Sequence, residues 1–120
     1  MNRKNWVKKI KAACEDAGTY QPYFDSVIDT LAGILERRDD AEAKFAEDPR
    51  LIIEHTNVGG KTNIEQNPVL RLINDLNRDA LAYWRDLGLT PAGLKKINEG
   101  AMNKNKKESA LEKALKNLGG

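Results

Sequence analysis

The sequence contains 120 residues, of which 40% are hydrophobic, 6% aromatic and 32% charged, and its net charge is +2. A chain of this length supports one domain with one modest core, and its lean apolar content favours a small helical protein that completes its core by self-association. The single cysteine, Cys14, excludes an internal disulfide and favours a reducing cytoplasm, no apolar run approaches the roughly 18 residues of a membrane span, and the basic N-terminus lacks the apolar segment of a signal peptide.

The first predicted element is an amphipathic helix. Apolar residues recur at helical spacing over residues 6–17, the lysines lie on the opposite face, and Gly18 provides a stop. Pro22 suits the first turn of a second helix, whose strong apolar stripe continues until Pro49 ends it. The short connection predicts that these two helices form an antiparallel hairpin.

Residues 51–67 interrupt the helical pattern. The run Leu51-Ile52-Ile53 favours extended structure, and Gly59-Gly60 favours a turn. Several asparagines in the same stretch are poor helix residues. We therefore expect a loop or an irregular hairpin inserted between helices.

The helical pattern resumes at Pro68, which opens a third helix that Gly88 can end in the left-handed conformation. Thr90 as N-cap and Pro91 as first residue begin a short fourth helix. We predict an all-α protomer with a single helical domain over residues 1–100. Residues 101–120 are predicted to form a basic linker and a short C-terminal helix that is flexible or depends on a partner.

The charges are distributed unevenly along the chain. The net charge is +5 over residues 1–11, −7 over residues 12–56, zero over residues 57–90 and +4 over residues 91–120. Such a chain offers anionic partners two separate basic patches. Charge runs are also typical of ordinary solvated helix faces, which is the simpler interpretation.

The stretch "HTNVGGKTN" ends in Gly-Lys-Thr, as the phosphate-binding loop of many ATPases does. The full motif, G-x-x-x-x-G-K-[ST], requires a first glycine where this chain has His55. Such a loop must also join a buried strand to a helix within a parallel sheet, and one candidate strand in 120 residues supplies no such sheet. We therefore expect no ATP binding at residues 59–62.

The segment from Tyr83 to Ile97 has the order of a helix-turn-helix: a helix, a glycine turn and a capped short helix. In such a unit Ala92, Lys95 and Lys96 would face DNA. The alternative is an ordinary helix corner without groove contact, which the length of the preceding helix favours.

No residue pattern indicates a metal or catalytic site. His55 is the only histidine, and it lacks the sequence neighbours that a zinc or catalytic histidine normally has. Asp39, Asp40 and Glu42 lie in a charged helical stretch, where they face solvent or pair with basic neighbours. We therefore expect no cofactor, no metal and no catalytic activity.

Three stretches carry a resemblance to a known family: "TLAGILERRDDAEAKF", "IEHTNVGGKTNIEQNPVLRLINDLNRDALAYWRDLGLTPAGLKKINE" and "SALEKALKNLG". From about Tyr20 to its end, the sequence resembles the small terminase subunit of tailed double-stranded-DNA bacteriophages. The shared features are a threonine-asparagine and glycine signature, a proline-led helix and an "LGLTP" corner. In this chain they are Thr56, Asn57, Gly60, Thr62, Asn63, Asn67, Pro68, Leu87, Gly88, Leu89, Thr90 and Pro91.

The resemblance implies a non-enzymatic partner of the large terminase subunit, which carries the ATPase and the nuclease. Small subunits recognise concatemeric phage DNA near the packaging start, regulate ATP hydrolysis and cutting, and generally assemble as helical rings. The implied partners are double-stranded phage DNA, the large subunit and further copies of this chain. The implied location is the cytoplasm of the infected bacterium and not the mature virion.

The resemblance supplies no residue-level DNA site, so the candidates rest on charge alone. Each basic side chain that neutralises a phosphate releases counterions. The N-terminal cluster is preferred, because it contains no acid and can present Lys4, Lys8 and Lys11 on one helix face, although the acidic helix that follows could neutralise that face. The candidates are Arg3, Lys4, Lys8, Lys9 and Lys11 at one end, and Lys95, Lys96, Lys104, Lys106 and Lys107 at the other.

The alternative function is a transcriptional regulator that uses the Leu87–Ile97 corner. A regulator predicts a dimer and palindromic DNA sites, whereas a ring predicts a high mass and more apolar positions than the monomer can bury. Leu31 and Leu35, in the middle of the second stripe, could serve either the core or a subunit interface.

Overall fold

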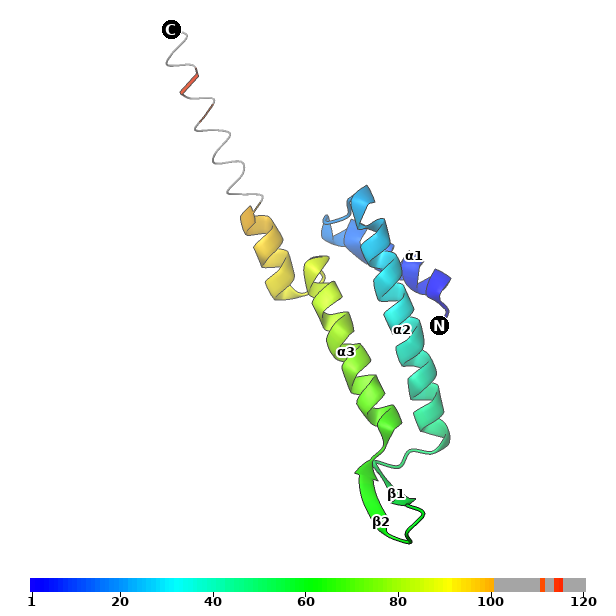
Figure 1. Cartoon of the computed structure of the whole chain (residues 1–120). Helices are drawn as coiled ribbons and strands as arrows, with labels where there is room; N and C mark the ends of the chain where they lie inside the picture. The colour runs from blue at the N-terminus through cyan, green and yellow to red at the C-terminus, as the bar shows by residue number, and fades with distance from the viewer. Residues whose placement is uncertain (101–110, 112–113, 116–120) are drawn as a thin grey trace.

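The computed structural model describes residues 1–100, 111, 114 and 115. Within them, α2 and α3 lie side by side and antiparallel, α1 lies across the first half of α2, and a β-hairpin projects from the far end (Figure 1). The elements in chain order are α1 (Arg3–Ala17), the 3-10 helix η1 (Pro22–Phe24), α2 (Asp25–Glu47), β1 (Ile52–Thr56), β2 (Thr62–Gln66), α3 (Pro68–Asp86) and a helix over residues 91–100.

The predicted all-α class is correct for most of the described chain, and the insert at residues 51–67 is the exception. The insert is a regular antiparallel hairpin, in which Thr56 pairs with Thr62 and Ile52 with Gln66. Its β-branched residues favour extended backbone, and the intervening residues form a tight turn. Local signals in the sequence therefore predict the position of the hairpin, and the structure adds that its two strands are regular and equal in length.

Helix α1 begins at an asparagine cap and ends at the predicted glycine stop. The side chain of Asn2 accepts a hydrogen bond from the Asn5 amide at 2.8 Å, which satisfies one of the free donors of the first turn. Gly18 ends the helix with a left-handed φ of 74°. Trp6, Ile10 and Cys14 are buried at i, i+4, i+8 spacing, so the stripe that they form faces α2.

The core lies between α2 and its two neighbours. Leu31 and Leu35 are fully buried, which assigns them to the core of the protomer and not to an exposed interface. Burying one such side chain stabilises the fold by about 1.5–3 kcal/mol. Helix α3 contributes Ile73, Leu76 and Ala80 to the other side of α2.

The longest pairing is α2 with α3, whereas the sequence predicted a hairpin of the first two helices. Helix α1 also packs on α2, where Arg3 contacts Asp29 and Trp6 contacts Asp39. The connection through the β-hairpin nevertheless brings all of α3 back along α2 (Figure 1). Short connections usually predict which helices pack antiparallel. Here a non-helical insert separates α2 from α3 in sequence, so their pairing could not be predicted in that way.

Asn67 fixes the hairpin to the start of α3. Its side-chain amide donates to the carbonyl oxygen of Arg50 at 2.8 Å, and its side-chain oxygen accepts from the Val69 amide at 3.0 Å. Its own amide donates to the Leu51 carbonyl at 2.9 Å. Asn67 is buried, so one residue both caps α3 and closes the base of the hairpin.

Candidate nucleic-acid interface

The basic residues of α1 do not share one environment. Lys4, Lys8 and Lys11 are exposed on the face opposite the buried stripe, as their i, i+4, i+7 spacing predicts. Within the described residues, Lys4 and Lys8 form no ion pair. Their charges are therefore available to an anionic partner.

Arg3, by contrast, belongs to the packing of α1 on α2. Its guanidinium donates two hydrogen bonds to the Asp29 carboxylate, at 3.0 and 2.8 Å. Its backbone amide donates to the Glu36 carboxylate at 2.6 Å. The hydrogen bond and charge of Asp29 raise the pKa of Arg3. The acidic face of α2 thus neutralises this one member of the predicted cluster.

Lys9 and Lys11 each lie over an aromatic ring of the same region. The ammonium of Lys9 is 5.1 Å from the centre of the Trp6 ring, and that of Lys11 is 5.0 Å from the centre of the Tyr20 ring. The Tyr20 hydroxyl raises the pKa of Lys11, and the hydroxyl itself donates to Asp25 at 2.8 Å. These cation–π contacts orient the ammonium groups of Lys9 and Lys11 on the α1 surface. Neither ammonium group is paired directly with a carboxylate of the described residues, so both keep their charge.

Asp39 organises a second cluster that the sequence pattern does not reveal. Its carboxylate accepts hydrogen bonds from the Trp6 indole at 2.7 Å, from Arg38 at 3.2 Å and from the amino terminus at 3.3 Å. Burial alone would raise the pKa of Asp39, but these donors outweigh it and lower the pKa. Asp39 thus pairs with Arg38, as the sequence allowed, and also fixes the position of α1 on α2.

The second basic group lies on the corner between α3 and the 91–100 helix. Gly88 takes a left-handed φ of 73°, and the Thr90 hydroxyl accepts from the Gly93 amide at 3.0 Å. Both predicted end signals are thus correct. Ala92, Lys95 and Lys96 are exposed, and Lys95 has Glu99 at 4.0 Å as a distant partner.

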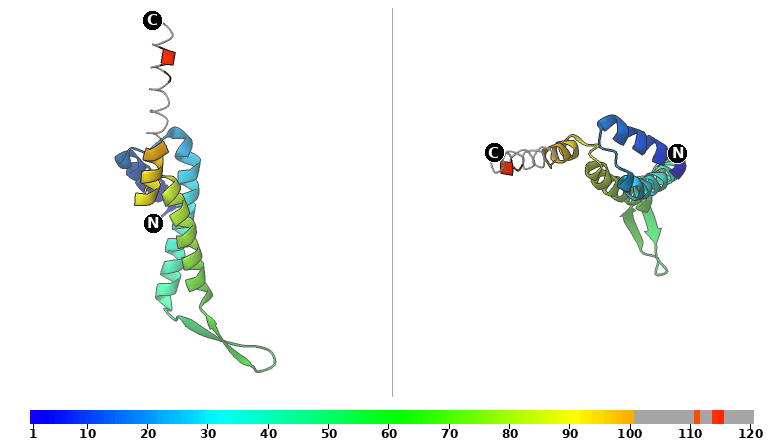
Figure 2. Two further views of the ribbon diagram at one scale, coloured as in Figure 1. Left: turned by 90° about the vertical axis from the view of Figure 1, so that its left-hand side faces the viewer. Right: turned by 90° about the horizontal axis from the view of Figure 1, so that it is seen from above.

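Gly93 permits the close approach of the two helices at this corner. A Cβ atom at position 93 would overlap the backbone carbonyl of Arg85. The corner also packs against the end of α1, where the Thr19 hydroxyl donates to the Leu87 carbonyl at 2.9 Å. The two helices that carry these basic groups, α1 and the 91–100 helix, both lie away from the β-hairpin (Figures 1 and 2). Lys104, Lys106 and Lys107 lie outside the described residues.

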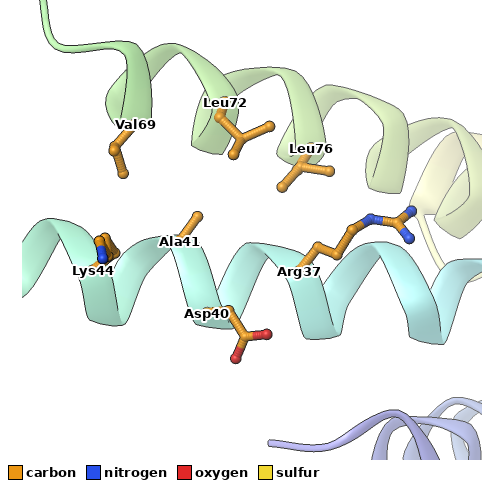
Figure 3. Close-up of a pocket in the computed structure, with 7 residues that line it drawn as sticks. All are labelled: Arg37, Asp40, Ala41, Lys44, Val69, Leu72 and Leu76. Atoms are coloured by element: carbon orange, nitrogen blue, oxygen red, sulfur yellow. The ribbon is translucent and has the colours of Figure 1, made fainter.

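A second surface feature is an apolar groove between α2 and α3, on the half nearer the hairpin. Ala41 from α2 and Val69, Leu72 and Leu76 from α3 line it (Figure 3). Leu72 is 49% exposed. The charged residues along its α2 side are Arg37, Asp40 and Lys44. Sequence reasoning missed this groove, because it depends on how α2 and α3 are placed against each other.

Comparison with known families decides the identity. The family model described as "Phage terminase, small subunit" matches residues 3–115, which is nearly the whole chain. The chain belongs to the phage terminase small-subunit family. The comparisons with curated proteins and with solved structures gave no match.

Family membership places this terminase small subunit in phage DNA packaging, and small terminase subunits are generally non-catalytic. Gly60 and Lys61 of the Gly-Lys-Thr stretch lie in the turn between two antiparallel strands, and Thr62 begins β2. Its Gly59 and Lys61 amides donate to the Asn57 side chain at 3.1 and 3.0 Å, and the Gly60 amide donates to the Asn57 carbonyl at 3.0 Å. The donors that would hold a phosphate are thus used within the turn.

The remaining residue of the small subunit that the sequence analysis considered for a metal or catalytic site is His55. His55 is exposed on β1, opposite Asn63. Within the described residues, no group of three or more His, Cys, Asp or Glu side chains is placed to hold a metal ion. Across that same part of the chain we find no helix with the length and apolar character of a membrane span.

Proposed function

We propose that this terminase small subunit binds double-stranded phage DNA through the exposed lysines of α1, assembles as a ring-forming homo-oligomer, and regulates the ATPase and nuclease of the large subunit. It would act in the cytoplasm of the infected bacterium and be absent from the mature virion. The observation that carries the DNA contact is the face of Lys4, Lys8 and Lys11, which is exposed on a helix held firmly by its opposite side.

The corner lysines supplement this face. Lys95 and Lys96 are exposed on the 91–100 helix, which lies on the same side of the hairpin as α1 (Figure 1), so one DNA segment could contact both groups. Each contact is weak by itself. A ring would repeat the contacts and raise the affinity by avidity, without any base-specific readout.

The experiment measures DNA affinity as a function of salt. The combined variant Lys4→Ala, Lys8→Ala and Lys11→Ala is expected to bind unrelated sequences more weakly, and each lost phosphate contact reduces the slope of log affinity against log salt by roughly 0.9. Lys61→Ala, at the hairpin turn, is the control and should bind like the unmodified protein. Normal binding by the triple variant with loss in Lys95→Ala, Lys96→Ala would make the corner the principal contact.

The proposed regulation has its own readout. Adding the small subunit to the large subunit and DNA should change the rate of ATP hydrolysis, and the triple variant should lose that effect in parallel with its DNA affinity. An unchanged ATPase rate with the unmodified small subunit would contradict the regulatory role while leaving DNA binding untouched.

One observation favours a second candidate, a helix-turn-helix regulator. The 91–100 helix is capped by Thr90 and packs closely on α3 through Gly93, which is the arrangement that presents a short helix to a DNA groove. A regulator would be a dimer that selects a palindromic site. Sequence-selective binding by a dimer, abolished by Lys95→Ala with Lys96→Ala, would support it over the packaging role.

A further inference from the structure

One face of the β-hairpin carries two isoleucines, Ile52 and Ile64, that the described part of the chain leaves exposed. Cross-strand partners share a face, so the pairs Glu54–Ile64 and Ile52–Gln66 place Ile52, Glu54 and Ile64 together. Ile52 is 59% exposed and Ile64 is 70% exposed. A two-stranded hairpin is only marginally stable by itself in water, so a surface that covers this face would stabilise it.

The opposite face of the hairpin is the one that faces the helices. Ile53 is half-buried, and it lines a pocket with Phe45 and Val69 near the end of α2. Because side chains alternate along a strand, Ile52, Glu54 and Ile64 point away from that contact. The hairpin also projects beyond α2 and α3 (Figure 2). Its apolar face therefore cannot reach the groove of its own protomer.

The α2–α3 groove has the dimensions and charges to receive this face. From Val69 to Leu76 the groove follows about 10 Å of helix, while two isoleucines on a strand diagonal are roughly 7 Å apart. Glu54 lies on the same face, opposite Ile64 and two residues from Ile52. Arg37 and Lys44 flank the groove, against one acid, Asp40 (Figure 3). The two exposed isoleucines thus match the apolar lining of the groove, and the negative charge of Glu54 matches the positive charges of Arg37 and Lys44.

We propose that the Ile52, Glu54 and Ile64 face of one copy docks in the α2–α3 groove of a second copy, with Glu54 facing Arg37 or Lys44 there. This inference rests on the proposed homo-oligomer, for which it supplies the contact. The two surfaces are different, so an open assembly has a free hairpin at one end and a free groove at the other until it closes. Such a head-to-tail contact generates a ring when the rotation between copies closes.

The first test uses disulfide crosslinking between two single variants of the full chain. Cys14 is fully buried, so it does not compete. A mixture of Ile64→Cys with Leu72→Cys is expected to form a crosslinked dimer on mild oxidation, whereas a mixture of Ile64→Cys with Leu81→Cys, which is also exposed on α3, is not. A mixture that crosslinks no better than this control would overturn the docking.

The second test exchanges the charges and follows the mass by native mass spectrometry. Glu54→Arg alone and Arg37→Glu with Lys44→Glu are each expected to shift the assembly to smaller species, and all three changes together to restore it. Glu65→Arg, on the opposite face of the same hairpin, is the matched control and should leave the mass unchanged. Circular dichroism on each variant separates loss of assembly from loss of folding.

The outcomes separate this inference from the proposed function. If the unmodified protein forms a ring and binds DNA, yet Glu54→Arg leaves its mass unchanged, the docking is wrong and the proposed function stands. If the unmodified protein is a monomer at high concentration, the proposed ring and the docking both fail. If Leu72→Cys forms no disulfide with Ile64→Cys but does form one with the large subunit when that subunit is added, the groove binds the large subunit and docking of a second copy is excluded.

Discussion

The Thr19 hydroxyl donates a hydrogen bond to the backbone carbonyl of Leu87 at 2.9 Å, across 68 positions of sequence. Both residues are buried. This one bond connects the end of α1 to the corner that precedes the 91–100 helix, and Gly88 allows it, because a Cβ there would lie 2.9 Å from the Thr19 methyl group. The helices that carry the two groups of basic residues, α1 and the 91–100 helix, are therefore connected by a buried hydrogen bond as well as by the chain.

Thr19→Val is expected to lower the free energy of unfolding by about 1–3 kcal/mol, because it removes the donor and leaves a buried carbonyl unsatisfied. Urea denaturation measures the change. Thr30→Val is the matched control, because the Thr30 hydroxyl donates to Ser26 on an exposed surface of α2, and it should change stability by much less. Equal effects of the two substitutions would contradict the role of the Thr19 bond.

Gly93→Ala tests the close packing of the corner. The added Cβ would overlap the Arg85 carbonyl, so the 91–100 helix must move away from α3, at an expected overpacking cost of about 1–3 kcal/mol. Hydrogen exchange of the α3 C-terminal amides should become faster. Gly100→Ala, where no atom of the described residues lies within 4 Å of the added Cβ, is the control. Unchanged exchange in Gly93→Ala would show that the two helices do not pack as described.

Asp39→Asn tests the cluster around Trp6 through its pH dependence. The pKa of Asp39 is lowered in the folded state, so the carboxylate contributes stability that is present above the unfolded pKa of about 3.9 and is lost as the pH falls through the folded value. At pH 7 the substitution should cost about 1–3 kcal/mol, since the hydrogen bonds involve a charged group. The difference from the unmodified protein should shrink as the pH is lowered below 4. A pH-independent difference would contradict the charge effect, and Asp40→Asn, on an exposed neighbour, is the control.

Arg3 and Lys4 are adjacent and carry the same charge, but we expect opposite phenotypes. Arg3→Ala removes the contacts with Asp29, so it should lower the melting temperature and leave the salt dependence of DNA binding almost unchanged. Lys4→Ala should leave the melting temperature unchanged and reduce the salt slope by up to roughly 0.9. Calorimetry and a salt titration on both variants provide the comparison. A larger reduction of the salt slope in Arg3→Ala than in Lys4→Ala would indicate that Arg3 contacts DNA.

Lys61→Ala tests the Gly-Lys-Thr turn. Asn57 already uses the neighbouring amides, so the isolated chain should show no ATP binding in a calorimetric titration, with or without Lys61. The ATPase rate of the large subunit in the presence of the variant should match that with the unmodified protein. Micromolar ATP binding that depends on Lys61 would refute this expectation.

Local signals predicted the ends of the elements, because the interactions that end a helix lie within a few residues. Gly18, Gly88 and Thr90 act as the sequence indicates. The resemblance to small terminase subunits is confirmed by the family match. The role of each lysine in DNA binding stays a prediction, since charge alone does not tell a DNA contact from a solvated face.

Long-range relationships could not be predicted in the same way. Nothing near Arg3 in sequence indicates Asp29 as its partner, and nothing near Thr19 indicates Leu87. The pairing of α2 with α3 was likewise hidden by the hairpin between them. The groove depends on that pairing, because Ala41 and Leu72 become neighbours only when the two helices lie side by side.

The hydrogen bonds of Asn67 limit where relatives of this chain can gain or lose residues. Its three hydrogen bonds join Arg50, Leu51 and Val69 at one point, so the segment that leads into β1 cannot move relative to the start of α3 without breaking them. The hydrogen bonds that Asn57 accepts stay within the turn between Thr56 and Thr62 and do not connect it to the helices, and Val58 at its tip is fully exposed. Insertions and deletions among relatives should therefore collect in that turn, where they alter the reach of the hairpin and leave the helices in place.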